Sequence, residues 1–246
     1  GWRVGQWLFR PMHRHFAPTL RLTVCGGAAL NPELAWKLDG LGWQLMIGYG
    51  LTETSPGIST DHPASLRIGS VGKPFPGVHV RLAPLAEMSG KEEAYGEVQV
   101  RGPNVFAGYH HLPEETAKAF TGNGWFRTGD LGWFDADGYL FLFGRASTLI
   151  VTEGGENVQP EDVEEIYQRH PVIRELGILA QAGQLVAVIV PEMREVRRRE
   201  SNIESAVREA LVATAHALPS YQRITDYGIT RDPLPRTRLG KLQRHR

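Results

Sequence analysis

Residues 48–56, Gly-Tyr-Gly-Leu-Thr-Glu-Thr-Ser-Pro, group an aromatic ring, hydroxyls and a carboxylate after a predicted strand. Tyr49 offers a face for stacking, Thr52 a hydroxyl for a phosphate oxygen, and Glu53 a hard oxygen ligand for Mg²⁺. The segment could be mistaken for a dinucleotide loop, but Glu53 stands at the third glycine position and Pro56-Gly57 follows instead of a helix. The residue types alone leave two interpretations open, a nucleotide site and a plain turn.

Each of four other segments, taken alone, has an ordinary structural interpretation. Gly26-Gly-Ala-Ala-Leu30 is typical of a turn from a strand into a helix, and Thr128-Gly-Asp130 is typical of a turn. The glycines of the segment Gly154-Gly155 permit backbone conformations that other residues avoid. Lys241 stands in a basic tail, where a lone lysine is usually a solvated charge.

The elements that must position these residues begin with an α/β unit. Residues 20–24 predict a short buried strand, and residues 43–47 predict a second strand. Between them, Asn31 as N-cap and Pro32 at the first helical position predict a helix over 32–41. In residues 65–143 the pattern changes to short segments of alternating apolar and polar residues. These segments predict the strands of a small β-barrel or curved sheet. Its strands and hairpin turn are expected at 78–82, 97–101 and 135–138.

The pattern changes again after Gly144-Arg145. Acidic residues in the first turn and a proline stop at Pro171 predict a helix over 160–170. Ser201 with Glu204 predicts a capping box that opens a longer helix. Strands are expected at 176–180, 185–190 and 224–229. Together these elements predict a compact α+β domain.

Composition excludes several classes of protein. Lys plus Arg and Asp plus Glu both number 27 among 246 residues, so net charge gives no argument for nucleic acid. The single cysteine, Cys25, cannot form an internal disulfide, and no apolar run approaches the roughly 18 residues that span a bilayer. We therefore expect a cytoplasmic protein without a transmembrane segment. A peripheral membrane contact is left open.

Taken in order, the motifs identify the chain as a member of the adenylate-forming superfamily, which includes acyl-CoA synthetases, luciferases and the adenylation domains of peptide synthetases. Residues 49–53 resemble its Tyr-Gly-x-Thr-Glu signature, and residues 26–30 resemble its adenine loop. Thr128-Gly-Asp-Leu131 resembles the ribose motif, and residues 144–164 resemble the hinge with its glycine-rich segment. Pro235-Arg-Thr-Arg-Leu-Gly-Lys241 resembles the C-terminal catalytic motif.

The resemblance implies a role for each matching residue. For binding of ATP, AMP or the thiol acceptor it implies Gly26, Gly27, Ala28, Tyr49, Gly50, Thr52, Asp130, Arg145, Gly154 and Gly155. Asp130 would bond the ribose hydroxyls, Arg145 ribose or phosphate, and the glycine pair would line the acceptor tunnel. Glu53 would hold Mg²⁺, and the catalytic residues would be Lys241, Thr52 and Glu53. Ser147 holds the hinge position, where the family usually has Asp or Lys.

The implied activity is ATP-dependent ligation of a carboxylate to coenzyme A through an acyl-adenylate, with Mg²⁺ as cofactor. Residues 68–78 and 101–109 are similar to long-chain acyl-CoA synthetases, which favours a fatty acid as the carboxylic acid. Two alternatives stay open. One is a fragment that binds nucleotide or a partner without catalysis, through an apolar face near Trp2, Trp7, Leu8 and Phe9. The other is a ligase that delivers its acyl group to a carrier protein.

The expected fold is mixed α and β and multidomain. Residues 1–143 would be the C-terminal part of the large AMP-binding domain, with an α/β piece at 1–63 and a distorted β-barrel subdomain at 64–143. A hinge at 144–148 would lead to a small, mobile α+β C-terminal domain at 149–246. No segment resembles the Ser/Thr/Gly-rich phosphate loop, so we expect the chain to begin inside a larger protein whose N-terminal half is missing.

Overall fold

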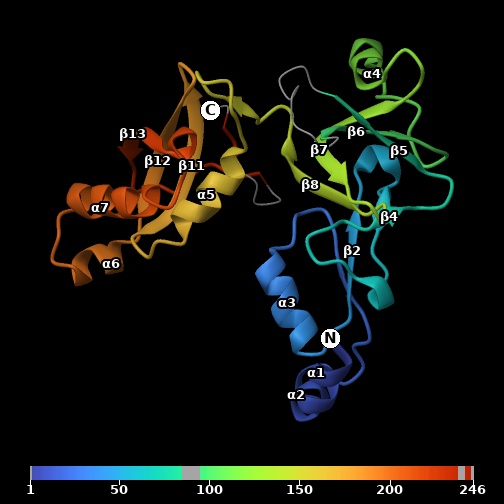
Figure 1. Cartoon of the computed structure of the whole chain (residues 1–246), viewed down its shortest axis with the longest axis horizontal. Helices are drawn as coiled ribbons and strands as arrows, with labels where there is room; N and C mark the ends of the chain where they lie inside the picture. Colours follow the sequence, from blue (N-terminus) through green and yellow to red (C-terminus); the bar gives the residue numbers. More distant parts are fainter. Residues whose placement is uncertain (1, 85–94, 238–241, 245–246) are drawn as a thin grey trace. The chain divides into compact units, whose positions relative to one another are not determined.

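The computed structural model describes residues 2–84, 95–237 and 242–244 (Figure 1). The chain divides into two compact units, residues 1–143 and residues 144–246. Throughout the described ranges, helices and strands are mixed in both units. In those same residues, no helix combines the length and the apolar character that a membrane crossing requires.

The first unit contains a four-stranded sheet with the order β1-β2-β3-β4. Its strands are β1 (Thr23–Cys25), β2 (Leu45–Tyr49), β3 (Ser59–Thr60) and β4 (Lys73–Pro74). β1 and β2 are parallel, whereas the β2–β3 and β3–β4 pairs are antiparallel. Parallel neighbours need a crossover, and α3 (Pro32–Gly40) supplies it. The predicted cap is confirmed, since Asn31 Oδ1 accepts from the backbone N–H groups of Glu33 and Leu34.

Two short helices, α1 (Trp2–Leu8) and α2 (Arg10–Phe16), precede this sheet. α1 packs against α3 and the turn that follows it. A Cβ atom on Gly5 would lie 2.2 Å from the backbone oxygen of Gly40, so only glycine permits this approach. Trp7 is 77% exposed, and Leu8 is also exposed. Of the predicted apolar face, Trp7 and Leu8 are therefore exposed, whereas Trp2 and Phe9 are half-buried.

A second sheet of the first unit has the order β5-β6-β7-β8. Its strands are β5 (His79–Ala83), β6 (Gly96–Arg101), β7 (Phe126–Phe134) and β8 (Leu140–Arg145), and α4 (Pro113–Ala119) precedes β7. The β5–β6 and β6–β7 pairs are antiparallel. Alternation along β6 buries Val98 and Val100 against Ile58 and Leu140 in the core of this unit.

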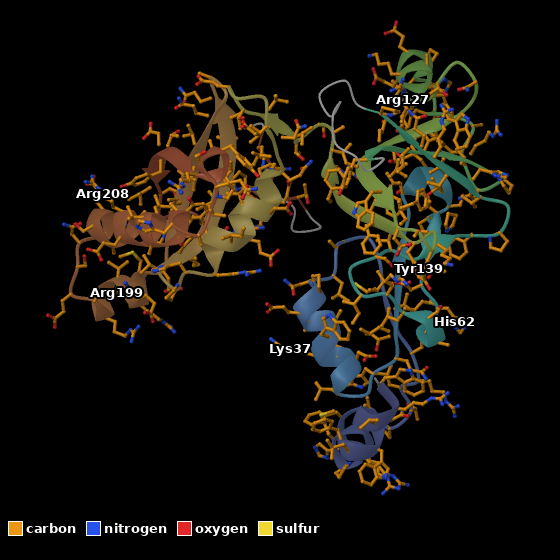
Figure 2. All side chains as sticks on the ribbon, in the orientation of Figure 1. Lys37, His62, Arg127, Tyr139, Arg199 and Arg208 are labelled. Atoms are coloured by element: carbon orange, nitrogen blue, oxygen red, sulfur yellow. The ribbon has the colours of Figure 1, made fainter. Side chains whose placement is uncertain are left out.

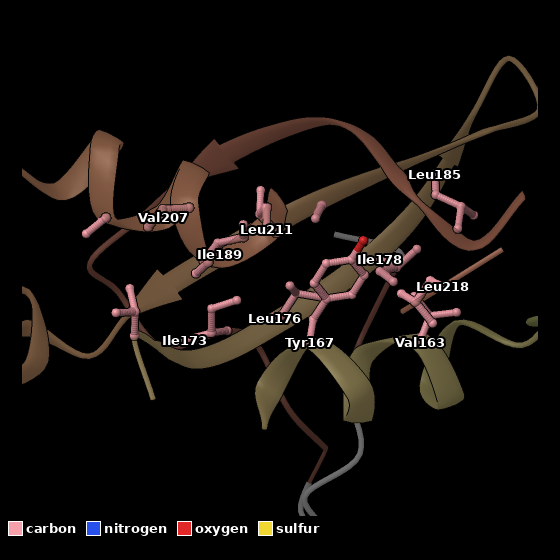
Figure 3. Packing of buried hydrophobic residues seen from close by; sticks show 14 of the residues in the cluster. Val163, Tyr167, Ile173, Leu176, Ile178, Leu185, Ile189, Val207, Leu211 and Leu218 are labelled. Atoms are coloured by element: carbon pink, nitrogen blue, oxygen red, sulfur yellow. The ribbon is translucent and has the colours of Figure 1, made fainter. Parts of the chain in front are cut away.

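The second unit is built on a sheet with the order β11-β12-β13. Its strands are β11 (Ile173–Gln181), β12 (Gln184–Pro191) and β13 (Ile224–Ile229), beside a short pair formed by β9 (Ile150–Val151) and β10 (Asn157–Val158). Its helices are α5 (Pro160–Gln168), α6 (Met193–Arg198) and α7 (Ile203–Ala215). Figure 3 shows Val163 and Tyr167 of α5 and Val207 and Leu211 of α7 within its hydrophobic core. Arg199 and Arg208, labelled in Figure 2, are solvent-exposed.

Two local predictions are wrong. The first strand spans Thr23–Cys25 and not residues 20–24, and it is not buried, because Val24 is 61% exposed. The cap of α7 is Asn202, whose Oδ1 accepts from the Ser205 backbone N–H at 2.7 Å, and not Ser201 in a capping box with Glu204. Both residues are good caps, and the register of the helix selects the second.

Candidate functional site

The two glycine-containing segments of the first unit lie side by side. The parallel register aligns Cys25 with Ile47, so Gly26-Gly27-Ala28, which follow β1, lie beside Gly48 and Tyr49, the last two residues of β2. A Cβ atom on Gly26 would lie 3.3 Å from the Gly48 oxygen, which shows how closely the two backbones approach. In open α/β sheets, ligands bind at the carboxyl ends of the strands. The geometry therefore fits a ligand site at this edge.

The loop after β2 is fixed by its own residues. A Cβ atom on Gly50 would lie 1.4 Å from the Pro56 oxygen, so this position requires glycine. The buried Thr54 side chain accepts from the Leu51 N–H at 2.9 Å and donates to the Leu51 oxygen at 3.0 Å. Thr54 thus performs the structural role in the loop, and it leaves the Thr52 side chain exposed to solvent.

Asp130 is brought to the same loop by a bulge in β7. Between the pairs Glu97–Leu131 and Gln99–Arg127, β7 has Thr128-Gly129-Asp130 opposite a single residue of β6. Gly129 has φ 72°, which favours glycine, and Thr128 Oγ1 donates to the Val98 oxygen at 2.7 Å. The Tyr49 Oη–H donates to Asp130 Oδ2 at 2.7 Å. The structure therefore joins two predicted nucleotide-binding residues that are far apart in the sequence.

Tyr109, which is not among the predicted site residues, is a neighbour of Glu53. The Tyr109 hydroxyl donates to Glu53 Oε1 at 3.0 Å, and the Phe106 N–H donates to the Glu53 backbone oxygen at 2.9 Å. Partial burial and the adjacent Glu53 raise the pKa of Tyr109. Tyr109 belongs to the segment 101–109, whose similarity to acyl-CoA synthetases was the only signal in the sequence.

The carboxylate of Glu53 fits a Mg²⁺ site of the open kind. Mg²⁺ is usually held by one or two carboxylates, with waters and substrate phosphates completing its shell. Glu53 is half-buried beside the exposed Thr52 hydroxyl, so its oxygens and this hydroxyl are accessible to an ion that arrives with phosphates. Within the described ranges, no group of three or more His, Cys, Asp or Glu residues forms a closed metal cage.

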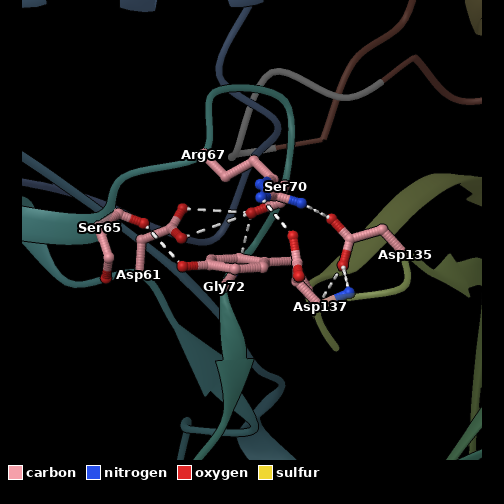
Figure 4. A network of polar contacts seen from close by, with 8 residues as sticks. Asp61, Ser65, Arg67, Ser70, Gly72, Asp135 and Asp137 are labelled. Carbon is pink, nitrogen blue, oxygen red and sulfur yellow. Dashed lines mark hydrogen bonds and ion pairs between the residues drawn. The ribbon is translucent and has the colours of Figure 1, made fainter.

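A polar network braces the segment between β3 and β4 (Figure 4). Arg67 forms ion pairs with Asp135 and, at 2.7 Å, with Asp137 of the β7–β8 turn. Asp61 is almost fully buried, and this burial raises its pKa to about 6. Its neighbour Ser70 has its Oγ 3.4 Å from both Asp61 carboxylate oxygens. Because β3 pairs with Tyr49 and Gly48, the network supports the strand that carries the site.

The remaining predicted binding residues belong to the second unit or its boundary. Arg145 ends β8 and is exposed, and its backbone oxygen accepts from the Leu149 N–H at 3.1 Å. Gly154 and Gly155 form the turn between β9 and β10. Gly155 has φ 81°, and its N–H donates to the Thr152 oxygen at 2.9 Å. These glycines are exposed on a regular hairpin turn, so their backbone is accessible, as the predicted lining of an acceptor tunnel requires.

Lys241, the predicted catalytic lysine, lies outside the described residues. Beyond it, Arg244 is fixed by Glu164 of α5, with Nη2 2.8 Å from Oε1 and 2.9 Å from Oε2, and by Glu161 at 2.9 Å. Burial raises the pKa of Glu164, while Arg244 opposes this rise. Glu164 Oε1 also accepts from the Ile178 N–H at 2.7 Å. The C-terminal segment is thus tied to both α5 and β11.

Comparisons with known proteins agree with this geometry. A family model described as AMP-binding enzyme matches residues 6–110, and one described as AMP-binding enzyme C-terminal domain matches residues 147–246. A long-chain-fatty-acid–CoA ligase from Mycobacterium bovis is 34% identical over 232 residues, which cover 85% of this chain and 37% of that ligase. A sulfoacetate–CoA ligase from Cupriavidus necator is 34% identical over 249 residues, which cover 97% of this chain and 46% of that ligase. The chain therefore spans less than half the length of these relatives.

A solved structure shares the fold as well. O-succinylbenzoate coenzyme A synthetase from Bacillus subtilis in complex with AMP superposes with a TM-score of 0.72 at 26% identity, covering 96% of this chain and 48% of that one. The same synthetase in complex with ATP and magnesium ion gives a TM-score of 0.71 at 26% identity, covering 96% of this chain and 49% of that one. The fold prediction is therefore confirmed: this chain has the C-terminal part of an adenylation domain and its small C-terminal domain.

Proposed function

This chain belongs to the AMP-binding enzyme family of AMP-forming acid–CoA ligases, and we propose that it is the C-terminal portion of an ATP-dependent carboxylate–CoA ligase. The observation that carries the proposal is the 2.7 Å contact between the Tyr49 hydroxyl and the Asp130 carboxylate. It brings an aromatic ring and a buried acidic group together beside the glycines at the carboxyl ends of β1 and β2. A nucleoside presents a base for stacking and two ribose hydroxyls for a carboxylate.

In the proposed site, Gly26, Gly27 and Ala28 lie against the adenine, with Tyr49 and Gly50 beside it. Asp130 accepts from the ribose hydroxyls, because a carboxylate has two acceptor oxygens. The exposed Thr52 hydroxyl donates to a phosphate oxygen. Glu53 would hold Mg²⁺, which supplies charge neutralisation for the phosphates when it is bound. Binding and charge neutralisation account for most of the catalysis of such reactions.

The proposed reaction has two steps. In the first, an oxygen of the carboxylic acid bonds to the α-phosphorus of ATP, the bond from that phosphorus to the bridging oxygen breaks, and pyrophosphate leaves. In the second, the coenzyme A thiol loses its proton to solvent, its sulfur bonds to the acyl carbon, the bond from that carbon to the phosphate oxygen breaks, and AMP leaves. In the first step the ammonium group of Lys241 would stabilise charge on the acid and α-phosphate, a contact whose loss commonly costs about 2–4 kcal/mol.

The second unit would serve both steps through different residues. We propose that Arg145 contacts ribose or phosphate and that the backbone of Gly154 and Gly155 lines the path of the thiol. We further propose that residues 144–148 act as the hinge, so that the mobile domain exchanges the contacts of adenylation for those of thioester formation. Support for this comes from the division of the chain after Phe143.

We propose a fatty acid as the carboxylic acid. The support is the 34% identity to a long-chain-fatty-acid–CoA ligase and the similarity of residues 68–78 and 101–109 to that class. Relatives of equal identity act on other acids, since a ligase named for 2-succinylbenzoate in Geobacillus sp. is also 34% identical. A panel of acids is therefore part of the test.

The test uses the full-length protein that carries this sequence, with ATP, Mg²⁺, coenzyme A and carboxylic acids of short, medium and long chain. AMP and pyrophosphate release are measured, together with thioester formation from a supplied acyl-adenylate. Lys241→Ala is the variant, and Lys37→Ala, at an exposed position of α3, is its matched control.

We expect Lys241→Ala to lose adenylate formation by roughly 30-fold to 1000-fold, which corresponds to about 2–4 kcal/mol, and to keep thioester formation from the supplied adenylate. Lys37→Ala should keep both steps. Equal loss of both steps would contradict the role of Lys241. Nucleotide binding without turnover of any acid would instead support nucleotide binding without catalysis, and transfer only to a phosphopantetheine-bearing carrier protein would identify the other acceptor class.

A further inference from the structure

The segment from residue 102 to residue 109 holds the loop that carries Thr52 and Glu53. Asn104 Nδ2 donates to the backbone oxygens of Thr54 at 3.1 Å and Gly57 at 2.5 Å. In the opposite direction, Ser55 Oγ donates to the Asn104 oxygen at 2.9 Å. Ser55 has φ 57°, so these bonds hold a backbone conformation that serine seldom adopts. The loop therefore depends on a segment that is distant in the sequence.

Tyr109 is itself fixed at three points. Its N–H donates to Thr116 Oγ1 of α4 at 2.9 Å, and its ring packs edge-on against Phe106 with 4.9 Å between centroids. Its hydroxyl donates to Glu53 Oε1 at 3.0 Å. The preceding Gly108 has φ 149° and would place a Cβ atom 2.6 Å from Thr116, so the chain reaches this position only through glycine. A side chain anchored in this way can orient the group that it contacts.

We propose that Tyr109 is a positioning residue for the Glu53 carboxylate. Its hydroxyl occupies Oε1 and fixes the plane of the carboxylate, so that the second oxygen is presented to the Mg²⁺ that arrives with ATP. Groups that hydrogen-bond to metal ligands commonly change metal affinity by 10-fold to 100-fold when they are removed. The proposal rests on the proposed function, because it requires Glu53 to be a Mg²⁺ ligand.

The test is a calorimetric titration of the full-length protein with ATP at increasing Mg²⁺ and with AMP in the absence of Mg²⁺. Tyr109→Phe removes the hydroxyl and keeps the ring against Phe106. Tyr221→Phe is the matched control, because Tyr221 is similarly exposed (both 37%) and lies in the second unit. Thr116→Val is the second variant, since it removes the hydroxyl that anchors the Tyr109 N–H.

We expect Tyr109→Phe to raise the Mg²⁺ concentration for half-maximal ATP binding about tenfold. Its AMP affinity without Mg²⁺ should change less than about twofold, because AMP lacks the β- and γ-phosphates with which ATP carries the ion. Thr116→Val should shift the Mg²⁺ requirement in the same direction by less, and Tyr221→Phe should not shift it. If the Tyr109→Phe variant does not fold, the Mg²⁺ requirement of the Thr116→Val variant tests the proposal.

An unchanged Mg²⁺ requirement in Tyr109→Phe and Thr116→Val would overturn the proposal. An equal loss of AMP and ATP affinity would also overturn it, because that result indicates a general structural role. Failure of the wild-type protein to bind either nucleotide would instead contradict the proposed function, so the two failures are distinguishable.

Discussion

The two units hold their candidate residues by different means. In the first unit, side chains from distant segments bind one another: Tyr49 contacts Asp130, and Tyr109 contacts Glu53. In the second unit, Gly154 and Gly155 occupy a turn that is closed by backbone hydrogen bonds and by a local contact between the Thr152 and Glu156 side chains, and the unit has a separate hydrophobic core. A side-chain network fixes the direction of polar groups, whereas an exposed turn mainly offers backbone. We therefore expect AMP affinity to depend mainly on the first unit, with a contribution from Arg145 at the boundary, and acceptor chemistry to depend on the second unit.

The largest effect on stability is expected from Glu164→Ala in the second unit. The substitution leaves the Arg244 guanidinium, whose side chain is only 12% exposed, without its bidentate partner. Loss of one partner of a buried pair costs about 3–5 kcal/mol, and the remaining Glu161 contact places the expected loss near 3 kcal/mol. Urea unfolding measures it, with the exposed Glu209→Ala as control. AMP affinity should not change, and a joint loss of stability and affinity would break the comparison between the units.

A second, pH-dependent effect is expected from Asp61 in the first unit. Burial raises the pKa of this carboxyl to about 6 in the folded chain, against the ordinary value of 3.8. The folded state therefore binds the proton more tightly, so the Asp61 contribution falls as the pH rises from about 4 to about 6. The shift from 3.8 to about 6 corresponds to about 3 kcal/mol at pH 7. Asp61→Asn should remove this fall and stabilise the chain by less than this amount, because the amide replaces one acceptor oxygen with a donor. Thermal unfolding between pH 4 and pH 7 tests it, and an unchanged pH profile would contradict it.

The smallest effects come from a matched pair of glycines. Gly27 has φ 79° and Gly155 has φ 81°, and neither would place a Cβ atom within 4 Å of another atom. Alanine at either position should therefore cost only the left-handed backbone strain, about 1–2 kcal/mol. The difference should appear in binding, since Gly27→Ala weakens AMP binding and Gly155→Ala slows thioester formation. Equal effects of both variants on AMP binding would remove the distinction between the units.

Local signals predicted much of the fold. Asn31 and Pro32 predicted the start of α3, and the last strand, predicted at 224–229, was found as β13. Helices α1 and α2 were not predicted: α1 depends on the close approach of Gly5 to Gly40, and α2 has Pro11 in its first turn but no side-chain cap. The contact of Glu53 with Tyr109 also had no local signal, because packing between two loops creates it.

The candidate site divides in the same way. The order of the motifs indicated Tyr49 and Asp130, and the structure brings their side chains into contact. The bulge that directs Asp130 was not predicted, since Thr-Gly-Asp alone is typical of a turn. The ligand roles of these residues, of Arg145 and of Lys241 stay predictions, because a role depends on a bound molecule and not on a local pattern.

The most direct measurement is AMP binding to the full-length protein and to its Asp130→Asn variant, with circular dichroism to verify that both are folded. Asparagine keeps the size of the side chain but replaces one acceptor oxygen with a donor and removes the charge. Loss of one or two hydrogen bonds to a charged group, about 1.5–3 kcal/mol, predicts AMP affinity lower by about 10-fold to 150-fold. A folded Asp130→Asn variant that binds AMP as tightly as the wild type would contradict the assignment of the nucleotide site.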